Sequence, residues 1–259
     1  MKTLFWLSIP AAILMAACTS SVQTTSGADY LAGYDGSYEI SGTAGPSDTD
    51  ADVRRIAAVE PNLKFPARIG IARVQDGALG VVPDTEGAIW QDLAEDLGPL
   101  YGEFVPVSPL IAAMVSEKPA AGSNAAARVI ADIRRGAARQ HLDYVLVYEV
   151  SSTMRNKASA LSVADLTVIG MFVLPGRNVE AEATASGLVI DVRNGYPYAT
   201  MTAFADKKGL SRTISAWSKQ ADFARTAEQK AVLELSDDVR DAMKTLGEAF
   251  AAQQAETKG

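Results

Sequence analysis

Residues 143–151, which read DYVLVYEVS, decide the fold of this 259-residue chain. Their side chains are nearly all apolar from Tyr144 to Tyr148, and β-branched and aromatic residues favour extended structure. A strand without strict alternation of apolar and polar residues is typical of the middle of a sheet, where both faces are covered. We therefore predict a buried central strand over this stretch.

The residues before this strand alternate between strand and helix patterns. Residues 67–74 (ARIGIARV) alternate apolar and polar side chains and predict a strand, followed by a turn at 75–77. Residues 86–97 place Ile89, Trp90, Leu93 and Leu97 on one helical face, and Gly98 and Pro99 end that helix. A short strand is expected at 104–107. A helix capped by Ser123 then precedes the central strand.

The residues after the central strand predict a hairpin and a long helix. The first hairpin strand is expected at 179–193, with a bulge at Gly187 where the apolar face changes over. Asn194 and Gly195 predict a two-residue type I′ turn, and 198–205 form the returning strand. Apolar residues at helical spacing over 215–254 predict one long amphipathic helix.

The order of these elements predicts one α/β domain over residues 65–255. Strands that alternate with helices imply crossover connections and parallel pairing, whereas the late hairpin is antiparallel. We therefore expect a mixed sheet with helices packed on it, a late β-hairpin and a long C-terminal helix.

The N-terminus has the three parts of a secretory signal. Lys2 is followed by a run of apolar residues at 4–17, and small residues close that run. The run is shorter than the roughly 20 residues that a transmembrane helix needs. Residues 1–17 are therefore predicted to be a signal peptide that is removed.

Cys18, the single cysteine of the chain, directly follows Met15, Ala16 and Ala17. This arrangement resembles the lipobox of bacterial lipoproteins, with Met15 at the position of the commoner leucine. The resemblance implies cleavage before Cys18 and acylation of Cys18 by diacylglycerol and a fatty acid such as palmitate, so that the lipid holds the protein to the membrane. Residue 19 is Thr rather than Asp, which in such lipoproteins implies transfer to the outer membrane, facing the periplasm.

Residues 18–64 are expected to be the lipidated N-terminus and a flexible tether. They are rich in Ser, Thr, Gly and Asp, and they hold too few large aliphatic residues to offset the entropy of ordering. Tyr30, Tyr34 and Tyr38 recur at a spacing of four, but Gly33 and Gly36 argue against a helix. These tyrosines either pack onto the domain or bind a partner.

A separate apolar run lies between the central strand and the hairpin. It covers residues 166–174 and carries no charge. As a helix it would be about 13.5 Å long, less than half of a bilayer core. Either it is buried in the domain, or it is exposed and contacts a partner or the membrane. In the second case the contacting residues are Leu166, Val168, Ile169, Met171, Phe172 and Leu174.

The residues that usually carry catalysis or bind metals are scarce. The chain has one cysteine and one histidine, so a disulfide or a Cys/His zinc site is excluded. His141 is expected at a helix-to-strand junction, and the acidic pairs Glu180/Glu182 and Asp237/Asp238 read as solvated charge. The net charge of -7 disfavours nucleic-acid binding. We expect no enzyme, no cofactor and no bound metal.

The stretch DYVLVYEV together with LVIDVRNG, which ends the first hairpin strand, resembles the α/β domain of the CsgG family and its relatives. These include the lipoprotein activators of penicillin-binding proteins and the amino-terminal domain of TolB. Asp191 and Gly195 take the places of the Asp and the turn Gly of that pattern, while Glu149 and Val150 replace its closing Gly. The resemblance covers about residues 66–250 and implies an envelope module that binds proteins or assembles.

Together these features predict a lipid-anchored envelope protein whose α/β domain binds another envelope protein as an accessory or assembly factor. Two alternatives stay open. The chain could bind or transport a lipid or other apolar ligand through the 166–174 element, or it could assemble into an oligomer of the secretion type.

Overall fold

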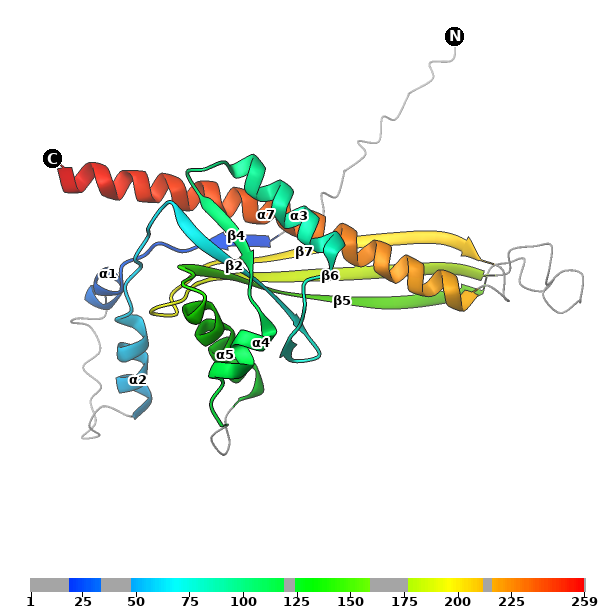
Figure 1. Cartoon of the computed structure of the whole chain (residues 1–259), viewed down its shortest axis with the longest axis horizontal. Coiled ribbons are helices and arrows are strands. Elements are labelled where there is room, and N and C mark those ends of the chain that lie inside the picture. The colour runs from blue at the N-terminus through cyan, green and yellow to red at the C-terminus, as the bar shows by residue number, and fades with distance from the viewer. Residues whose placement is uncertain (1–18, 34–47, 119–123, 159–176, 212–215, 259) are drawn as a thin grey trace, which may run out of the picture.

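The computed structural model describes residues 19–33, 48–118, 124–158, 177–211 and 216–258 (Figure 1). They form a seven-stranded sheet in the order β1-β7-β6-β5-β2-β3, and β4 also pairs with β2. The strands are β1 (Thr19–Val22), β2 (Ala67–Gln75), β3 (Ala78–Leu79), β4 (Gly102–Pro106), β5 (Tyr144–Ala158), β6 (Arg177–Asp191) and β7 (Pro197–Ser211). The helices are α1 (Gly27–Ala32), α2 (Asp48–Ala57), α3 (Asp84–Leu97), α4 (Pro109–Val115), α5 (Ala125–Arg139) and α7 (Ala216–Lys258).

The predicted mixed α/β fold is confirmed. β2 runs parallel to β4 and β5, whereas β6 is antiparallel to both β5 and β7, and β7 is antiparallel to β1. The central strand lies where the sequence places it, between β6 and β2. β5 is longer than predicted because it continues to Ala158, and with β6 and β7 it forms a long three-stranded arm (Figure 1).

Helices cover both faces of the sheet and bury two apolar cores. The larger core lies under α7 and α3, where Tyr144, Tyr148 and Tyr198 pack against Trp90 and the inner residues of α7. The smaller core lies under α5 and contains Ile133, Val145, Val147 and Ile190. Val145 and Leu146 of the central strand are both fully buried, one in each core, which is why its sequence lacks alternation.

A buried ion pair holds α3 on the sheet. Arg73 Nε of β2 lies 3.0 Å from Glu86 Oε2 of α3, and the side chains of both are at most 11% exposed. The Tyr148 hydroxyl donates a hydrogen bond to the same carboxylate at 2.7 Å. Charges that are removed from water need such partners, so these three side chains fix the position of α3 over β2 and β5.

The long C-terminal helix is confirmed, and it approaches the sheet through small residues. α7 lies along the arm (Figure 1), and Ala227, Ala231 and Leu235 of its inner face are fully buried. A bulge at Gly187 was predicted, and this is wrong. Gly187 stays in register with Tyr148 and Met201, and a Cβ atom there would lie 3.3 Å from Leu235 Cδ1. Gly187 therefore makes room for α7, and the irregularity falls at Val189/Ile190.

The hairpin is confirmed, but its turn differs from the predicted type I′ turn. That turn needs positive φ at both central residues. Gly195 has a φ of 78°, whereas Asn194 does not lie in this region. The loop is longer than two residues, with Asp191 N donating to Tyr196 O and Gly195 N donating to Asp191 O.

The N-terminal segment differs from the predicted tether in the parts that the structure describes. Residues 19–22 form β1, in which Thr19 pairs with Thr202 and Val22 with Ala199 at the edge of the sheet. Residues 27–32 form α1, which contains Tyr30 and ends at Gly33. This stretch is ordered although it has few large aliphatic side chains. The backbone of β1 pairs with β7, and Gly27 allows α1 to approach Ala57 closely. Tyr34 and Tyr38 lie outside the described residues.

Two smaller expectations about helices also need correction. The cap of α5 is Asn124, whose Oδ1 accepts a hydrogen bond from Ala126 N at 2.9 Å, rather than Ser123. The helix α4 was not predicted. No helix in the described part of the chain is long and apolar enough to cross a membrane.

The contact between α7 and Gly187 leads to a prediction about stability. Leu235→Ala should lower the free energy of unfolding by about 2–5 kcal/mol, because it opens a cavity between α7 and the sheet. Leu233→Ala on the same helix is the matched control, since Leu233 is 50% exposed and the same change there should cost little. Urea unfolding followed by circular dichroism measures both. Equal losses in the two variants would contradict this packing.

Candidate functional site

The main candidate site is the helix α4, whose seven residues (PLIAAMV) are all apolar. Ser108 caps it, with its Oγ accepting a hydrogen bond from Ile111 N at 3.4 Å, and Pro109 occupies the first turn. Ala112 is its buried residue. Leu110 and Met114, one turn apart, are 79% and 78% exposed. Adjacent exposed apolar side chains of this size are typical of interaction surfaces.

The exposure of α4 does not come from loose packing. A Cβ atom on Gly136 of α5 would lie 2.8 Å from Ala112 Cβ, so the glycine allows the two helices to touch closely. Gln140 connects the start of α4 to the end of α5: its Oε1 accepts from Ser108 N at 2.9 Å, and its Nε2 donates to Pro106 O at 3.2 Å. α4 therefore holds Leu110 and Met114 in a fixed outward position.

Two grooves flank α5 beside this helix. The larger, of about 660 Å³, lies between the turn at Gly77, α4 and α5, and its lining combines alanines, Leu79 and Val129 with polar and charged residues of α5 and of the segment 116–118 that follows α4. At its rim Arg135 pairs with Glu117 at 2.7 Å and Asp132 at 2.9 Å. The smaller groove, of about 350 Å³, is apolar and runs over β5 and β6. We call Leu110, Met114 and the larger groove the α4–α5 surface.

Sequence reasoning missed this surface, although a signal for it exists. Ser108 followed by Pro109 is a common start of a helix, and the five residues after Pro109 are apolar or small. The helix is too short for its periodicity to be recognised. Exposure depends on packing against Gly136, which is far away in the sequence.

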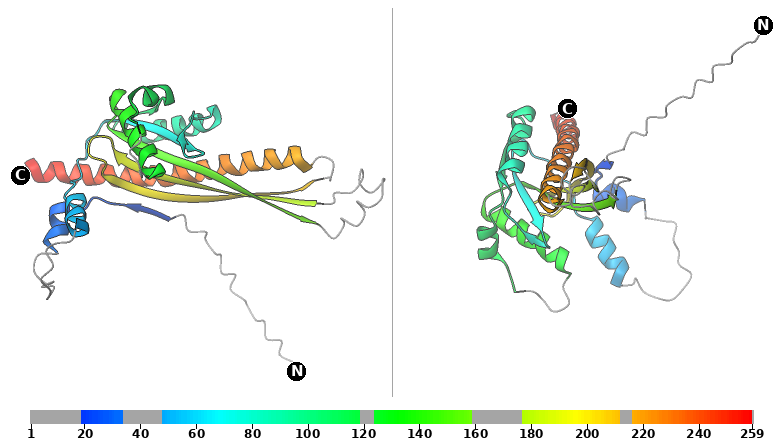
Figure 2. Two further views of the ribbon diagram at one scale, coloured as in Figure 1. Left: turned by 90° about the horizontal axis from the view of Figure 1, so that it is seen from below. Right: turned by 90° about the vertical axis from the view of Figure 1, so that its right-hand side faces the viewer.

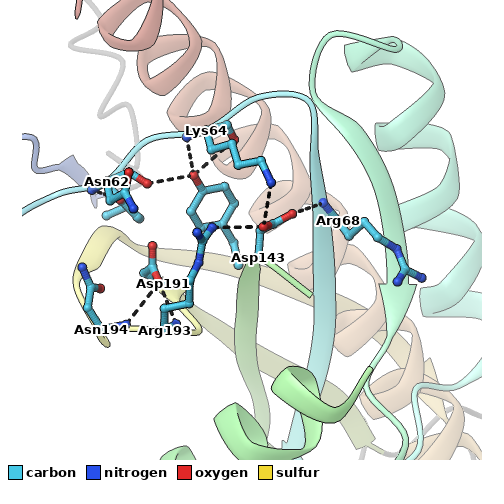
Figure 3. A network of polar contacts seen from close by, with 9 residues as sticks. Asn62, Lys64, Arg68, Asp143, Asp191, Arg193 and Asn194 are labelled. Atoms are coloured by element: carbon cyan, nitrogen blue, oxygen red, sulfur yellow. Dashed lines mark hydrogen bonds and ion pairs between the residues drawn. The ribbon is translucent and has the colours of Figure 1, made fainter. Parts of the chain in front are cut away.

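A polar cluster lies at the opposite end of β5 from the arm and joins the N-terminal segment to the hairpin (Figure 3). Asp143 accepts a hydrogen bond from Arg68 N at 3.0 Å through Oδ2. Its Oδ1 accepts from Arg193 Nη2 at 3.0 Å and lies 3.6 Å from Lys64 Nζ. Asp143 therefore connects β2, β5 and the β6–β7 turn.

Asp191 of the same cluster shapes that turn. It is fully buried, and its Oδ1 accepts hydrogen bonds from Arg193 N at 2.7 Å and Asn194 N at 3.3 Å. Asn194 Nδ2 in turn donates to Glu60 O at 2.8 Å. Asp191 and Gly195 are the residues on which the family resemblance is based. Both shape the turn: Asp191 binds its backbone N–H groups, and Gly195 adopts a φ of 78°.

Tyr144 and Tyr198 complete the cluster beneath the segment 60–65. The Tyr144 hydroxyl accepts a hydrogen bond from Lys64 N at 2.6 Å, and the Tyr198 hydroxyl accepts from Asn62 N at 2.7 Å. Burial raises the pKa of Tyr144 to about 12, and it also raises the pKa of Tyr198. Tyr148 beside Glu86 and Tyr196 beside the N-terminal segment have pKa values that burial raises as well.

The other residues singled out in the sequence do not form a common site. Cys18 and the 166–174 run, with Leu166, Val168, Ile169, Met171, Phe172 and Leu174, lie outside the described residues. His141 is exposed at the junction of α5 and β5 with a φ of 57°. Asp237 pairs with Arg240 on α7, and burial raises the pKa of Asp238 beside Asp241. Among the described residues, no group of acidic, His or Cys side chains could hold a metal ion.

Known proteins give only distant likenesses. No protein-family model matches the chain, and no curated protein matches it. Among solved structures, the chain is similar to a minor lipoprotein from Acinetobacter baumannii at 9% identity and a TM-score of 0.33, covering 70% of this chain and 92% of the other. Rare lipoprotein B from Shewanella oneidensis shows 8% identity and a TM-score of 0.30, with coverage of 74% and 99%.

A PelC dodecamer from Paraburkholderia phytofirmans is also similar, at 16% identity and a TM-score of 0.29, with coverage of 66% and 87%. Identities and TM-scores this low define neither a family nor a function for this chain.

The buried tyrosines predict how the protein responds to alkali. A phenol whose pKa is raised by folding stabilises the fold fully below its unfolded pKa of about 10, and this contribution is lost as the pH rises through the folded pKa. Tyr144, Tyr148, Tyr196 and Tyr198 should therefore ionise above pH 10, together with loss of the fold. Absorbance at 295 nm with circular dichroism measures both, and concentrated guanidinium chloride gives the unfolded reference. Complete ionisation near pH 10 with the fold intact would contradict this arrangement.

Proposed function

We propose that this chain is a lipoprotein of the bacterial cell envelope, anchored through Cys18 in the outer membrane and facing the periplasm. Its α/β domain acts as an accessory or assembly module that binds another envelope protein. It works by binding rather than by catalysis.

Support for the anchor comes from the residues on both sides of Cys18. Before it stand a signal-like segment and the lipobox residues Met15, Ala16 and Ala17. Directly after it, Thr19 begins β1 in register with Thr202. A lipid on Cys18 would thus be attached next to the edge of the sheet, without an intervening tether.

The single observation that carries the binding role is the exposure of Leu110 and Met114 on a helix that is itself firmly held. Burying two such side chains against a partner would contribute roughly 1.5–3 kcal/mol each. The groove beside them, with Arg135, Glu117 and Asp132 at its rim, supplies the polar border that is typical of protein interfaces. A protein partner would cover the two apolar side chains and contact the charged residues at the rim of the groove.

The anchor is tested by Cys18→Ser in a bacterial host. The variant lacks the thiol that receives the diacylglycerol, so it should lose acyl mass and leave the membrane fraction. Intact mass spectrometry and membrane fractionation measure these effects against the parent chain. An unacylated parent chain, or a Cys18→Ser variant that stays membrane-bound, would contradict the anchor.

The binding role is tested by a photo-crosslinking residue placed at Leu110 in the intact envelope. A discrete adduct should form there, and it should be lost when Met114→Ser is added. The same residue at Leu233, which is also exposed but lies on α7, should give no such adduct. Mass spectrometry identifies the partner. If both positions give the same adducts, or neither gives any, the α4–α5 surface is not the binding site.

A further inference from the structure

A second exposed apolar surface lies on α1 and α2. Tyr30 of α1 and Val53 and Ile56 of α2 are 45%, 47% and 62% exposed, respectively. All three border a groove of about 590 Å³ that is closed on its other side by the turn at Asn194–Pro197. We call these three residues the α1–α2 patch. These residues are not part of the α4–α5 surface.

The patch is held in place by contacts at its base. Gly27 N and Ala28 N, at the start of α1, donate hydrogen bonds to the Glu60 carboxylate at 3.1 and 2.9 Å. A Cβ atom at Gly27 would lie 2.1 Å from Ala57 O, so the glycine allows α1 to touch the end of α2. The Tyr196 hydroxyl donates to Thr25 O at 2.9 Å and joins this unit to the hairpin.

The position of the patch relates it to Cys18. Only the four residues 23–26 separate the end of β1 from the start of α1. Figure 2 shows β1, α1 and α2 along one side of the molecule, while α3, α4 and α5 lie along the other. β1 and β3 are the two ends of the sheet order, so the α4–α5 surface lies toward the opposite edge from β1.

We infer that the α1–α2 patch rests on the surface of the lipid bilayer that holds Cys18. This inference depends on the proposed lipid anchor. Consecutive Cα atoms lie about 3.8 Å apart, so a lipid on Cys18 would bring the bilayer surface next to Thr19, which is fixed in the sheet. The bilayer must then run along the side of the molecule that carries β1, α1 and α2.

The chemistry of the patch fits a bilayer surface. Tyrosine and aliphatic side chains are favoured at the boundary between lipid headgroups and acyl chains. The helix α2 carries three aspartates (Asp48, Asp50 and Asp52) against Arg54 and Arg55, so it has no net positive charge to attract anionic lipid, and the contact depends on apolar insertion. The patch is small, and it contacts lipid only because the anchor keeps it close, as in any two-point attachment.

A single fluorescent label tests this contact. Acylation blocks the thiol of Cys18, the chain's single cysteine, so Val53→Cys supplies the free thiol for an NBD label in the full lipidated protein. The protein is reconstituted into phosphatidylethanolamine–phosphatidylglycerol vesicles that contain doxyl-labelled lipid. We expect a shift of NBD emission to shorter wavelength and quenching by the doxyl group, and raised salt should not reverse either. Leu110→Cys, labelled in the same way on α4, is the matched control and should show neither effect.

Two further variants separate the contact from the anchor. Adding Ile56→Ser to Val53→Cys should reduce the quenching, and so should a flexible serine- and glycine-rich spacer inserted between Cys18 and Thr19. Vesicle flotation and acyl mass report the anchor independently. A protein that is acylated and floats, yet is quenched no more at position 53 than at position 110, overturns the bilayer contact and leaves the anchor intact. Absence of acyl mass overturns the proposed anchor and the contact with it.

Discussion

The close approach of α7 to the arm is the constraint on which the rest of the structure depends. β6 and β7 carry buried apolar side chains from Ala183 to Val189 and from Tyr198 to Ala205, and a helix must cover this face of the sheet. Small residues allow this close cover: Ala185 and Ala203 on the strands and Ala227 and Ala231 on the helix are buried in one core, and Gly187 leaves room for Leu235 of α7. The small residues of the strands therefore let the side chains of α7, Leu235 among them, pack directly on the sheet.

Larger side chains pack at the other end of the sheet, where β5 begins at Tyr144 and β7 begins at Pro197. Where the small residues end, tyrosines fill the wider space between the sheet and the segment that precedes β2, and each phenol finds a backbone partner. The Tyr144 hydroxyl accepts a hydrogen bond from Lys64 N, and the Tyr198 hydroxyl accepts one from Asn62 N. These two bonds attach the segment that leads into β2 to the sheet. Asp143 and Asp191 then order the neighbouring β6–β7 turn (Figure 3). The N-terminal segment can therefore pair as β1 without a large apolar content of its own.

Much of the fold could be predicted from periodicity, and the failures share a cause. The central strand, α3 and α7 follow from local patterns, because each carries enough apolar residues to reveal its period. The errors at Gly187, at the β6–β7 turn and in β1 concern residues that contact distant parts of the chain: Leu235, Glu60 and Thr202, respectively. The α4–α5 surface was missed for a similar reason, since the exposure of Leu110 depends on packing between α4 and Gly136.

The position of β1 places the two exposed apolar surfaces differently with respect to the proposed anchor. They lie toward opposite edges of a sheet whose strands are spaced about 4.8 Å apart, so the five steps from β1 to β3 span about 24 Å. An anchor at Cys18 would bring the β1 edge and the α1–α2 patch to the bilayer. The same geometry would turn Leu110 and Met114 toward the periplasm, beyond the reach of lipid headgroups. A flexible tether would impose no such orientation. A lipid on Cys18 would impose it, because the next residue, Thr19, cannot move without breaking its pairing with Thr202.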